Sequence, residues 1–274
     1  MLDLAFSVLL AALPALLLLA WFRRQDRARP EPVGLLGRSV LYGFLATVPA
    51  AALEILLLRF GPSGLRLLAA AFDAFVVAGL VEEGVKYFFV RRYLLGRPEF
   101  DERMDGILYA ACVSLGFAFA ENILYGYADR TILFFRAFTA VPMHAAVTGI
   151  MGYWIGRAKI EGRAGRGTEL EPGRGTEPGR GTELDRIRAG RLAPGTELGG
   201  GSLSGTELER PDRPPRAIRG LWEAVLLHGA YDFFLFTRSA WALMAVPVLI
   251  AAIIRLLLLV SDAKRRDRGF QEYA

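Results

Sequence analysis

The sequence predicts an all-α fold, a polytopic transmembrane helical bundle of about seven spans with one disordered cytoplasmic loop. Hydrophobic residues make up 53% of the chain, and they are concentrated in blocks of about twenty, a length that lets a helix cross a hydrocarbon core of about 30 Å. A soluble domain would instead spread its apolar residues along amphipathic helices or strands. In addition, every second connection between the blocks is basic, which is typical of a chain that crosses a membrane repeatedly.

The apolar blocks give the predicted spans, which in order are 2–22, 36–58, 66–90, 106–128, 132–156, 219–237 and 240–260. The first block is followed rather than preceded by arginines, which favours a retained span over a cleaved signal peptide. Arginine and lysine cluster after the first, third, fifth and last spans, whereas the other connections are short and nearly neutral. The positive-inside rule therefore predicts that the N-terminus lies outside and the C-terminus in the cytoplasm.

The connection 157–219 has a different composition from the rest of the chain. It repeats Gly-Thr-Glu-Leu or Gly-Thr-Glu-Pro five times and is rich in Gly, Pro, Arg and Glu. Such a segment cannot bury enough apolar surface to offset chain entropy, so we expect a disordered cytoplasmic linker. The predicted organisation is spans one to five in 1–156, the linker in 157–219, the last two spans in 220–262 and a basic cytoplasmic tail in 263–274.

Composition also limits the classes of function. The net charge of +5 is explained by basic residues at the ends of spans, so we expect contact with the lipid bilayer and no nucleic-acid partner. The single cysteine, Cys112, excludes an intramolecular disulfide framework. The sequence contains no HExxH, GxSxG, Walker A or dinucleotide-binding motif.

Ionisable residues inside the spans are the main functional signal, because a charge at the bilayer centre costs at least about 2.5–3.5 kcal/mol. The third span contains Glu82, Glu83 and Lys86. Glu82 and Lys86 are spaced i, i+4 and can form an ion pair on one helix face. Glu83 lies about 100° around the helix from Glu82, so an ion pair explains only one of the two glutamates. Two neighbouring carboxylates of which one is neutralised suit general acid–base chemistry.

Three further spans carry polar residues at similar predicted depths. The fourth contains Glu121 and Asn122, the fifth contains His144, and the sixth contains His228 and Asp232. The two histidines are the only ones in the chain. His228 and Asp232 are spaced i, i+4, so the carboxylate can orient the imidazole. Glu54, Arg136 and Arg255 lie closer to span ends, where snorkelling or interfacial pairing is expected.

Together the motifs form an ordered set, Glu82-Glu83-x-x-Lys86, Phe117-x-x-x-Glu121-Asn122, His144 and His228-x-x-x-Asp232. This set resembles the PrsW family of intramembrane proteases and is more distantly similar to the CAAX-type prenyl-protein endopeptidases and bacteriocin-processing proteins. The resemblance covers about 70–235 and is interrupted by the repeat linker. It implies a helical protease of the bacterial cytoplasmic membrane that cleaves membrane-anchored protein substrates, for example anti-sigma factors.

Peptide hydrolysis requires an activated water, stabilisation of the oxyanion and a proton donor for the leaving amine. We expect Glu82 or Glu83 to act as the general base, with Lys86 deciding which carboxylate stays ionised. Glu121 is expected to be a metal ligand or a second acid, and Asn122 a polar donor to the substrate.

A divalent metal, with zinc the best suited, is expected at His144, His228 and Glu121, because two imidazoles and a carboxylate leave an open position for water. Without a metal, the two histidines would donate to the oxyanion, and this glutamate-driven alternative remains open. Asp232 would orient His228 in either case.

Two other classes of function use the same residues. A proton- or ion-coupled transporter employs intramembrane Glu, Asp and His as a relay, although the sequence lacks the internal repeat that many transporters show. A membrane scaffold or sensor would use the polar groups only to hold its helices together. Alanine replacement of Glu82, Glu83, His144 or His228 separates the three, because only a protease loses substrate cleavage while still accumulating in the membrane.

Overall fold

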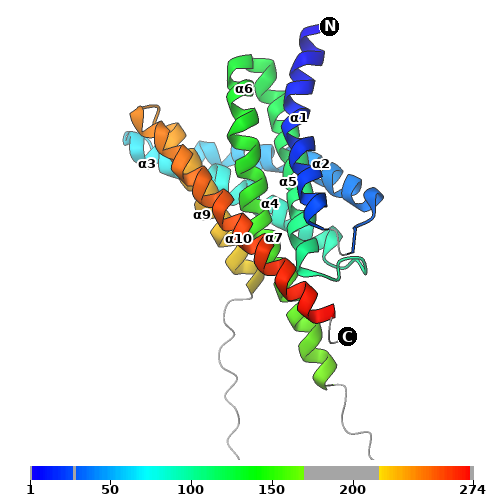
Figure 1. Cartoon of the computed structure of the whole chain (residues 1–274). Coiled ribbons are helices and arrows are strands. Elements are labelled where there is room, and N and C mark those ends of the chain that lie inside the picture. The colour runs from blue at the N-terminus through cyan, green and yellow to red at the C-terminus, as the bar shows by residue number, and fades with distance from the viewer. Residues whose placement is uncertain (1, 27–28, 170–215, 272–274) are drawn as a thin grey trace, which may run out of the picture. The chain divides into compact units, whose positions relative to one another are not determined.

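The computed structural model describes residues 2–26, 29–169 and 216–271, and every regular element among them is helical. The predicted all-α bundle is therefore confirmed. In chain order the helices in Figure 1 are α1 (Leu2–Gln25), α2 (Val33–Leu57), α3 (Arg66–Ala71), α4 (Val81–Phe89), α5 (Arg103–Ala128), α6 (Arg130–Phe138), α7 (Ala140–Glu169), α9 (Arg216–Phe236) and α10 (Ala245–Gln271).

The helices occupy the predicted spans. Within the described residues, five stretches are long and apolar enough to cross a membrane, namely Val8–Gln25, Val33–Phe60, Arg103–Tyr125, Thr131–Gly162 and Ala240–Arg268. The other two predicted spans are also helical, and they are the ones that carry Glu82, Glu83 and Lys86 or His228 and Asp232. Charged side chains lower the hydropathy of a segment, and these two remain predicted spans.

The predicted bounds of the linker are wrong at both ends. Helix α7 continues to Glu169 and α9 begins at Arg216, so both ends of the predicted segment 157–219 are helical. The remainder of the predicted linker, 170–215, lies outside the described residues.

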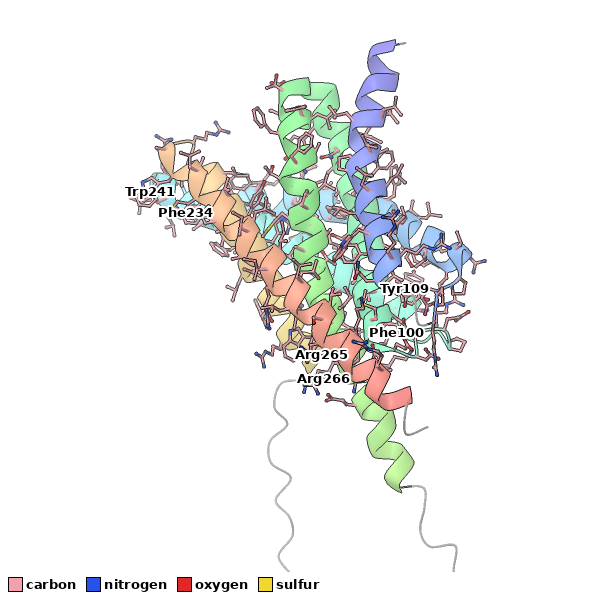
Figure 2. The ribbon with its side chains drawn as sticks, viewed as in Figure 1. Phe100, Tyr109, Phe234, Trp241, Arg265 and Arg266 are labelled. Carbon is pink, nitrogen blue, oxygen red and sulfur yellow. The ribbon has the colours of Figure 1, made fainter. Side chains whose placement is uncertain are left out.

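The basic connections gather at one end of the bundle. Helix α1 begins at the opposite end from the end of α10, as expected for an odd number of crossings (Figure 1). Figure 2 shows Arg265 and Arg266 near the end of α10, on the same side as Phe100 in the basic connection between α4 and α5. We call this the basic end of the bundle.

Helix α5 is the central element of the fold. It contacts α1, α2, α6 and α10, and its residues from Arg103 to Ala118 are buried. Its start is fixed by a capping box, in which Glu102 and Asp105 accept each other's backbone N–H groups. Asp129 separates α5 from α6 and accepts hydrogen bonds from the backbone N–H of Thr131 at 2.7 Å and Ile132 at 3.4 Å.

Glycines allow the neighbouring helices to approach α5 closely. A Cβ on Gly116 would lie 1.9 Å from the carbonyl oxygen of Val40 in α2, and one on Gly43 would lie 1.7 Å from the carbonyl oxygen of Val113. Between α5 and α7, Gly106 and Gly152 make the same kind of approach. Small residues at helix contacts are the usual means of tight packing in membranes. These contacts fix the rotation of α2, α5 and α7 about the site.

Helix α4 is flanked by two π-helical segments, Phe72–Leu80 before it and Val90–Leu94 after it. The first of these lies against α9, where Gly229 leaves room for the ring of Phe75. Local π-helical geometry is often found at functional sites, because it changes the direction of the side chains that follow. Here it sets the position of α4 against α9.

Candidate functional site

Helix α4 places two carboxylates and one ammonium group in the interior of the bundle. The side chains of Glu83 and Lys86 are 0% exposed and that of Glu82 is 7% exposed. Lys86 Nζ donates to Glu82 Oε2 at 3.0 Å and to Glu83 Oε1 at 2.8 Å. It also lies 4.2 Å from the centroid of the Phe117 ring. The single positive charge of Lys86 is thus shared by two carboxylates. If both are ionised, the three groups carry a net charge of −1.

The two glutamates have different surroundings. Glu83 accepts a second hydrogen bond from Thr148 Oγ1 at 2.8 Å, and its Oε1 lies 3.0 Å from His228 Nδ1. Both of its oxygens are therefore occupied by protein donors. Glu82 contacts Lys86 and faces a cavity. Glu82 is the glutamate that a water molecule or substrate can reach.

His144 is held between α4 and α5. Its Nδ1 lies 3.0 Å from Lys86 Nζ, and its Nε2 lies 2.7 Å from Glu121 Oε2. An ammonium group can only donate, so Nδ1 accepts and the proton is assigned to Nε2, which donates to Glu121. The backbone carbonyl of His144 accepts a hydrogen bond from Ser114 Oγ at 2.7 Å. These contacts therefore fix the position of α7 at His144, the orientation of the His144 ring and the nitrogen that carries its proton.

His228 reaches the same place from α9. Its Nδ1 faces Glu83, and its Nε2 lies 3.3 Å from Asp232 Oδ2 and 4.0 Å from Glu82 Oε2. The rings of His144 and His228 are 4.9 Å apart at their centroids and nearly perpendicular, at 85°. Asp232 stands one turn along α9 from His228, as its i, i+4 spacing predicts.

Glu121 and Asn122 project from the far half of α5 toward Arg136 of α6. Arg136 donates from Nη2 to Glu121 Oε2 at 3.0 Å and from Nε to Asn122 Oδ1 at 3.1 Å. Asn122 is buried, its Nδ2 has no partner among the described residues, and it does not line the cavity. The structure thus places Asn122 behind Arg136 rather than at the cavity wall.

A cavity of about 660 Å³ covers this group of residues. Glu82, Glu121, His144, His228 and Asp232 line its floor. The rest of its wall comes from the ends of α2, α5 and α9 and the beginnings of α3, α6 and α7. By chain direction these are the ends that lie away from the basic end. The cavity therefore reaches the site from the half of the bundle opposite the basic end.

The donor groups of the site are compatible with a divalent metal. Glu82, Glu83, His144 and His228 each place one donor atom within 4.8 Å of the others. Imidazole and carboxylate groups in this number suit zinc. Glu121, which the sequence analysis includes among the ligands, contacts His144 and Arg136 and is outside this group. Lys86 contacts three of the four members, so its ammonium group competes with a metal ion for the same donors.

The sequence analysis did not identify three residues of the site, Ser114, Arg136 and Thr148. Arg136 was expected at the interface, but its side chain is only 18% exposed and reaches inward because Glu121 and Asn122 offer acceptors there. Thr148 follows His144 by four positions and therefore shares its helix face. Ser114 precedes Glu121 by two turns, so it shares a face with that residue. Helical spacing around the predicted residues could have found both hydroxyl groups.

Comparison with known proteins identifies the family of this chain. A family model described as PrsW family intramembrane metalloprotease matches residues 31–171, more than half of the chain. The match contains Glu82, Glu83, Lys86, Glu121 and His144 and ends before α9. The assignment of His228 and Asp232 to the site therefore depends on the structure. No solved structure matches the chain.

Several curated relatives carry the name Protease PrsW. The one from Geobacillus kaustophilus (strain HTA426) is 38% identical over 157 residues, which cover 57% of this chain and 68% of the relative. Those from Clostridioides difficile (strain 630) and Bacillus subtilis (strain 168) are 36% and 34% identical, covering 59% and 57% of this chain and 69% and 70% of the relatives. These matches support proteolysis and not ion-coupled transport. The chain therefore belongs to the PrsW family and is an intramembrane protease.

Proposed function

We propose that this protease hydrolyses peptide bonds of membrane-anchored proteins with Glu82 as the general base. The observation that carries the assignment is the difference between the two glutamates. Glu82 faces the cavity, whereas both oxygens of Glu83 are occupied by Lys86, Thr148 and His228. A general base must lie within reach of the water that it deprotonates, and only Glu82 meets that requirement.

In the proposed reaction, Glu82 takes a proton from a water molecule while the water oxygen forms a bond to the scissile carbonyl carbon. The carbonyl oxygen becomes an oxyanion, which the guanidinium group of Arg136 can stabilise from the cavity wall. The C–N bond then breaks, and protonated Glu82 returns its proton to the leaving amine. Glu83 and Asp232 hold the ring of His228 from its two nitrogens.

A divalent metal fits the donor set, and His144, His228 and Glu82 or Glu83 would hold it. When bound, such an ion polarises a carbonyl group and acidifies a coordinated water. The description of the family as metalloproteases supports this assignment. We propose zinc, because two imidazoles with a carboxylate are a common ligand set for that metal.

The shape of the cavity supports entry of the substrate from the half of the membrane opposite the basic end. By the positive-inside rule this is the outer half. Arg66, Asp73 and Arg238 lie along the wall of the cavity, which suits a polar stretch of chain next to a transmembrane segment. We propose a single-span protein, for example an anti-sigma factor, that is cut near the outer end of its span.

Comparison of Glu82→Gln with Glu83→Gln tests the assignment of the base. Each variant is expressed with an epitope-tagged single-span substrate that the wild type cuts. Glu82→Gln should lower the cleavage rate about 10²–10⁴-fold and leave the melting temperature in detergent close to that of the wild type. Glu83→Gln should lower the melting temperature, because it removes a buried partner of Lys86 and His228.

Glu99→Gln, in an exposed part of the basic end, is the matched control and should cleave at the wild-type rate. Wild-type cleavage by Glu82→Gln would contradict the proposal. The requirement for a metal is measured on the same protein after exhaustive chelation. Loss of cleavage that Zn²⁺ restores supports the metal, whereas unchanged cleavage favours the route that uses the glutamate alone.

A further inference from the structure

A second group of acidic residues lies at the basic end, far from the hydrolytic site. Asp26 follows the last residue of α1, and Glu102 and Asp105 stand at the start of α5. Asp105 precedes Glu121 by sixteen positions on the same helix, a rise of about 24 Å. All three side chains are buried, with Asp26 2%, Glu102 6% and Asp105 0% exposed.

The oxygens of this group converge. One carboxylate oxygen from each of Asp26, Glu102 and Asp105 lies within 4.8 Å of the others. Oxygens on opposite sides of a bound Ca²⁺ are on the order of 5 Å apart, since each Ca–O distance is about 2.3–2.6 Å. The three carboxylates are thus close enough to bind the same ion.

Two oxygens in the group have no partner among the described residues, namely Asp26 Oδ1 and Asp105 Oδ1. The other oxygen of each residue is already used. Asp26 Oδ2 accepts from the backbone N–H of Glu31 at 3.1 Å, and Asp105 Oδ2 accepts from the backbone N–H of Asp101 and Glu102 at 2.8 and 2.6 Å. A buried carboxylate oxygen without a hydrogen-bond donor destabilises the folded state. A bound cation or a proton on each of these two oxygens would remove that penalty.

Arg24, Lys264 and Arg268 line the same cavity as Asp26 and Glu102, and three of the cationic side chains near the group have identified partners. Arg103 donates to Asp267 of α10 at 3.1 Å, and Lys264 donates to Gln25 at 3.2 Å. Arg29 contacts Asp101 at 3.2 Å and reaches Glu102 at 3.5 Å, which compensates only one of the three carboxylates. Burial raises the pKa of Asp26, and it raises the pKa of neighbouring Glu31 to about 7. Among the described residues, neither Asp26 nor Asp105 has an ion-pair partner.

A cavity of about 390 Å³ gives access to the group, and both Asp26 and Glu102 line it. Tyr109, which Figure 2 shows near Phe100 at this end of the bundle, donates a hydrogen bond to Glu31. Carboxylates without nitrogen or sulfur ligands are the set that hard divalent cations prefer. We propose that Asp26, Glu102 and Asp105 bind a hard divalent cation, Ca²⁺ or Mg²⁺, which joins the end of α1 to the start of α5.

The test uses the full-length protein in detergent after removal of metals with a chelator. Binding of Ca²⁺, Mg²⁺ and Mn²⁺ is measured by equilibrium dialysis with elemental analysis, and the melting temperature is recorded with and without each ion. Because the hydrolytic site can also hold a metal, every measurement is repeated with His144→Ala/His228→Ala. We expect about one hard cation per chain and a rise in melting temperature in both proteins, since an ion that binds only the folded state stabilises it.

Asp26→Asn and Asp105→Asn should lose the ion and the rise in melting temperature. Asp101→Asn, the same change in an exposed neighbour, should retain both. Asp26 is outside the capping box, so Asp26→Asn decides the outcome if Asp105→Asn does not fold. The proposal is overturned if none of the three ions binds, if binding disappears with the two histidines, or if Asp26→Asn still binds. It is also overturned if Asp26→Asn alone stabilises the metal-free protein while the wild type does not respond to any ion.

Discussion

Lys86 determines how charge is shared within the proposed hydrolytic site. Its ammonium group contacts Glu82, Glu83 and His144 at 2.8–3.0 Å and is fully buried. Because it donates to Nδ1 of His144, it also decides which nitrogen of that ring carries the proton. A single side chain thus sets the charge of two carboxylates and the tautomer of an imidazole.

Replacement of Lys86 by methionine should be strongly destabilising. Lys86→Met leaves Glu82 and Glu83 buried without a cation, and loss of one partner of a buried ion pair costs about 3–5 kcal/mol. Thermal unfolding in detergent measures the loss. The double variant Lys86→Met/Glu83→Gln restores the wild-type net charge of these three positions and should recover much of the stability, although it should remain inactive. A single variant that melts at the wild-type temperature would show that the ion pair contributes little.

At the scale of helices, the site depends on close contacts that the sequence does not reveal directly. Glu82 faces the cavity and Glu83 faces His228 because α4 has one particular rotation between two π-helical segments. The break between α6 and α7 at Thr139 turns Arg136 toward Glu121. Hydrophobic blocks define the length of a span but not its rotation or a break within it. The spacing of residues in the sequence predicted which polar side chains share a helix. The packing of the helices determines which of these side chains are in contact.

The contact of α2 with α5 gives a prediction at this scale. A Cβ on Gly116 would meet the backbone of Val40 at 1.9 Å, whereas one on Gly84 in α4 has nothing within 4 Å. Gly116→Ala should therefore lower the free energy of unfolding by about 1–3 kcal/mol or more. Gly84→Ala should be neutral or stabilising by about 0.5–1 kcal/mol, because alanine is the better helix former.

Both alanine variants are compared by their melting temperatures and by the amount of protein in the membrane. They introduce the same methyl group into a helical glycine position, so a general effect of the substitution would appear in both. Equal behaviour of the two would indicate that α2 can move away from α5 without loss of the fold.

At the scale of the whole molecule, the hydrolytic site is assembled from α4, α5, α7 and α9. The sequence predicted this assembly because isolated charges are expensive in a membrane, so polar residues on different spans are expected to meet. It also predicted the helical class and the positions of the spans. It did not predict the second acidic group, because Asp26, Glu102 and Asp105 lie outside or at the edge of the apolar blocks, where charged residues are common.

Removal of the repeats should leave hydrolysis intact. Residues 170–215 contain no histidine or cysteine, and the contacts of the site described above come from α4, α5, α6, α7 and α9 alone. Deletion of residues 172–208, which removes four of the five repeats, should change the cleavage rate less than about twofold, compared at equal amounts of protein in the membrane. An inserted deletion variant that cannot cleave would assign the repeats a part in substrate delivery.

The use of one lysine for two glutamates has a consequence for electroneutrality. Within the part of the chain that the structure describes, Glu82, Glu83, Glu121 and Asp232 form ion pairs with two permanent cations, Lys86 and Arg136. Two further positive charges are needed to balance the site, and protons or one divalent ion can supply them equally well. Uptake of such an ion would therefore expel protons from the interior of the bundle, so affinity for the ion should rise with pH. If the proposed metal binds, the acidity of the compartment that the cavity faces would then help to set the fraction of the enzyme that holds an ion.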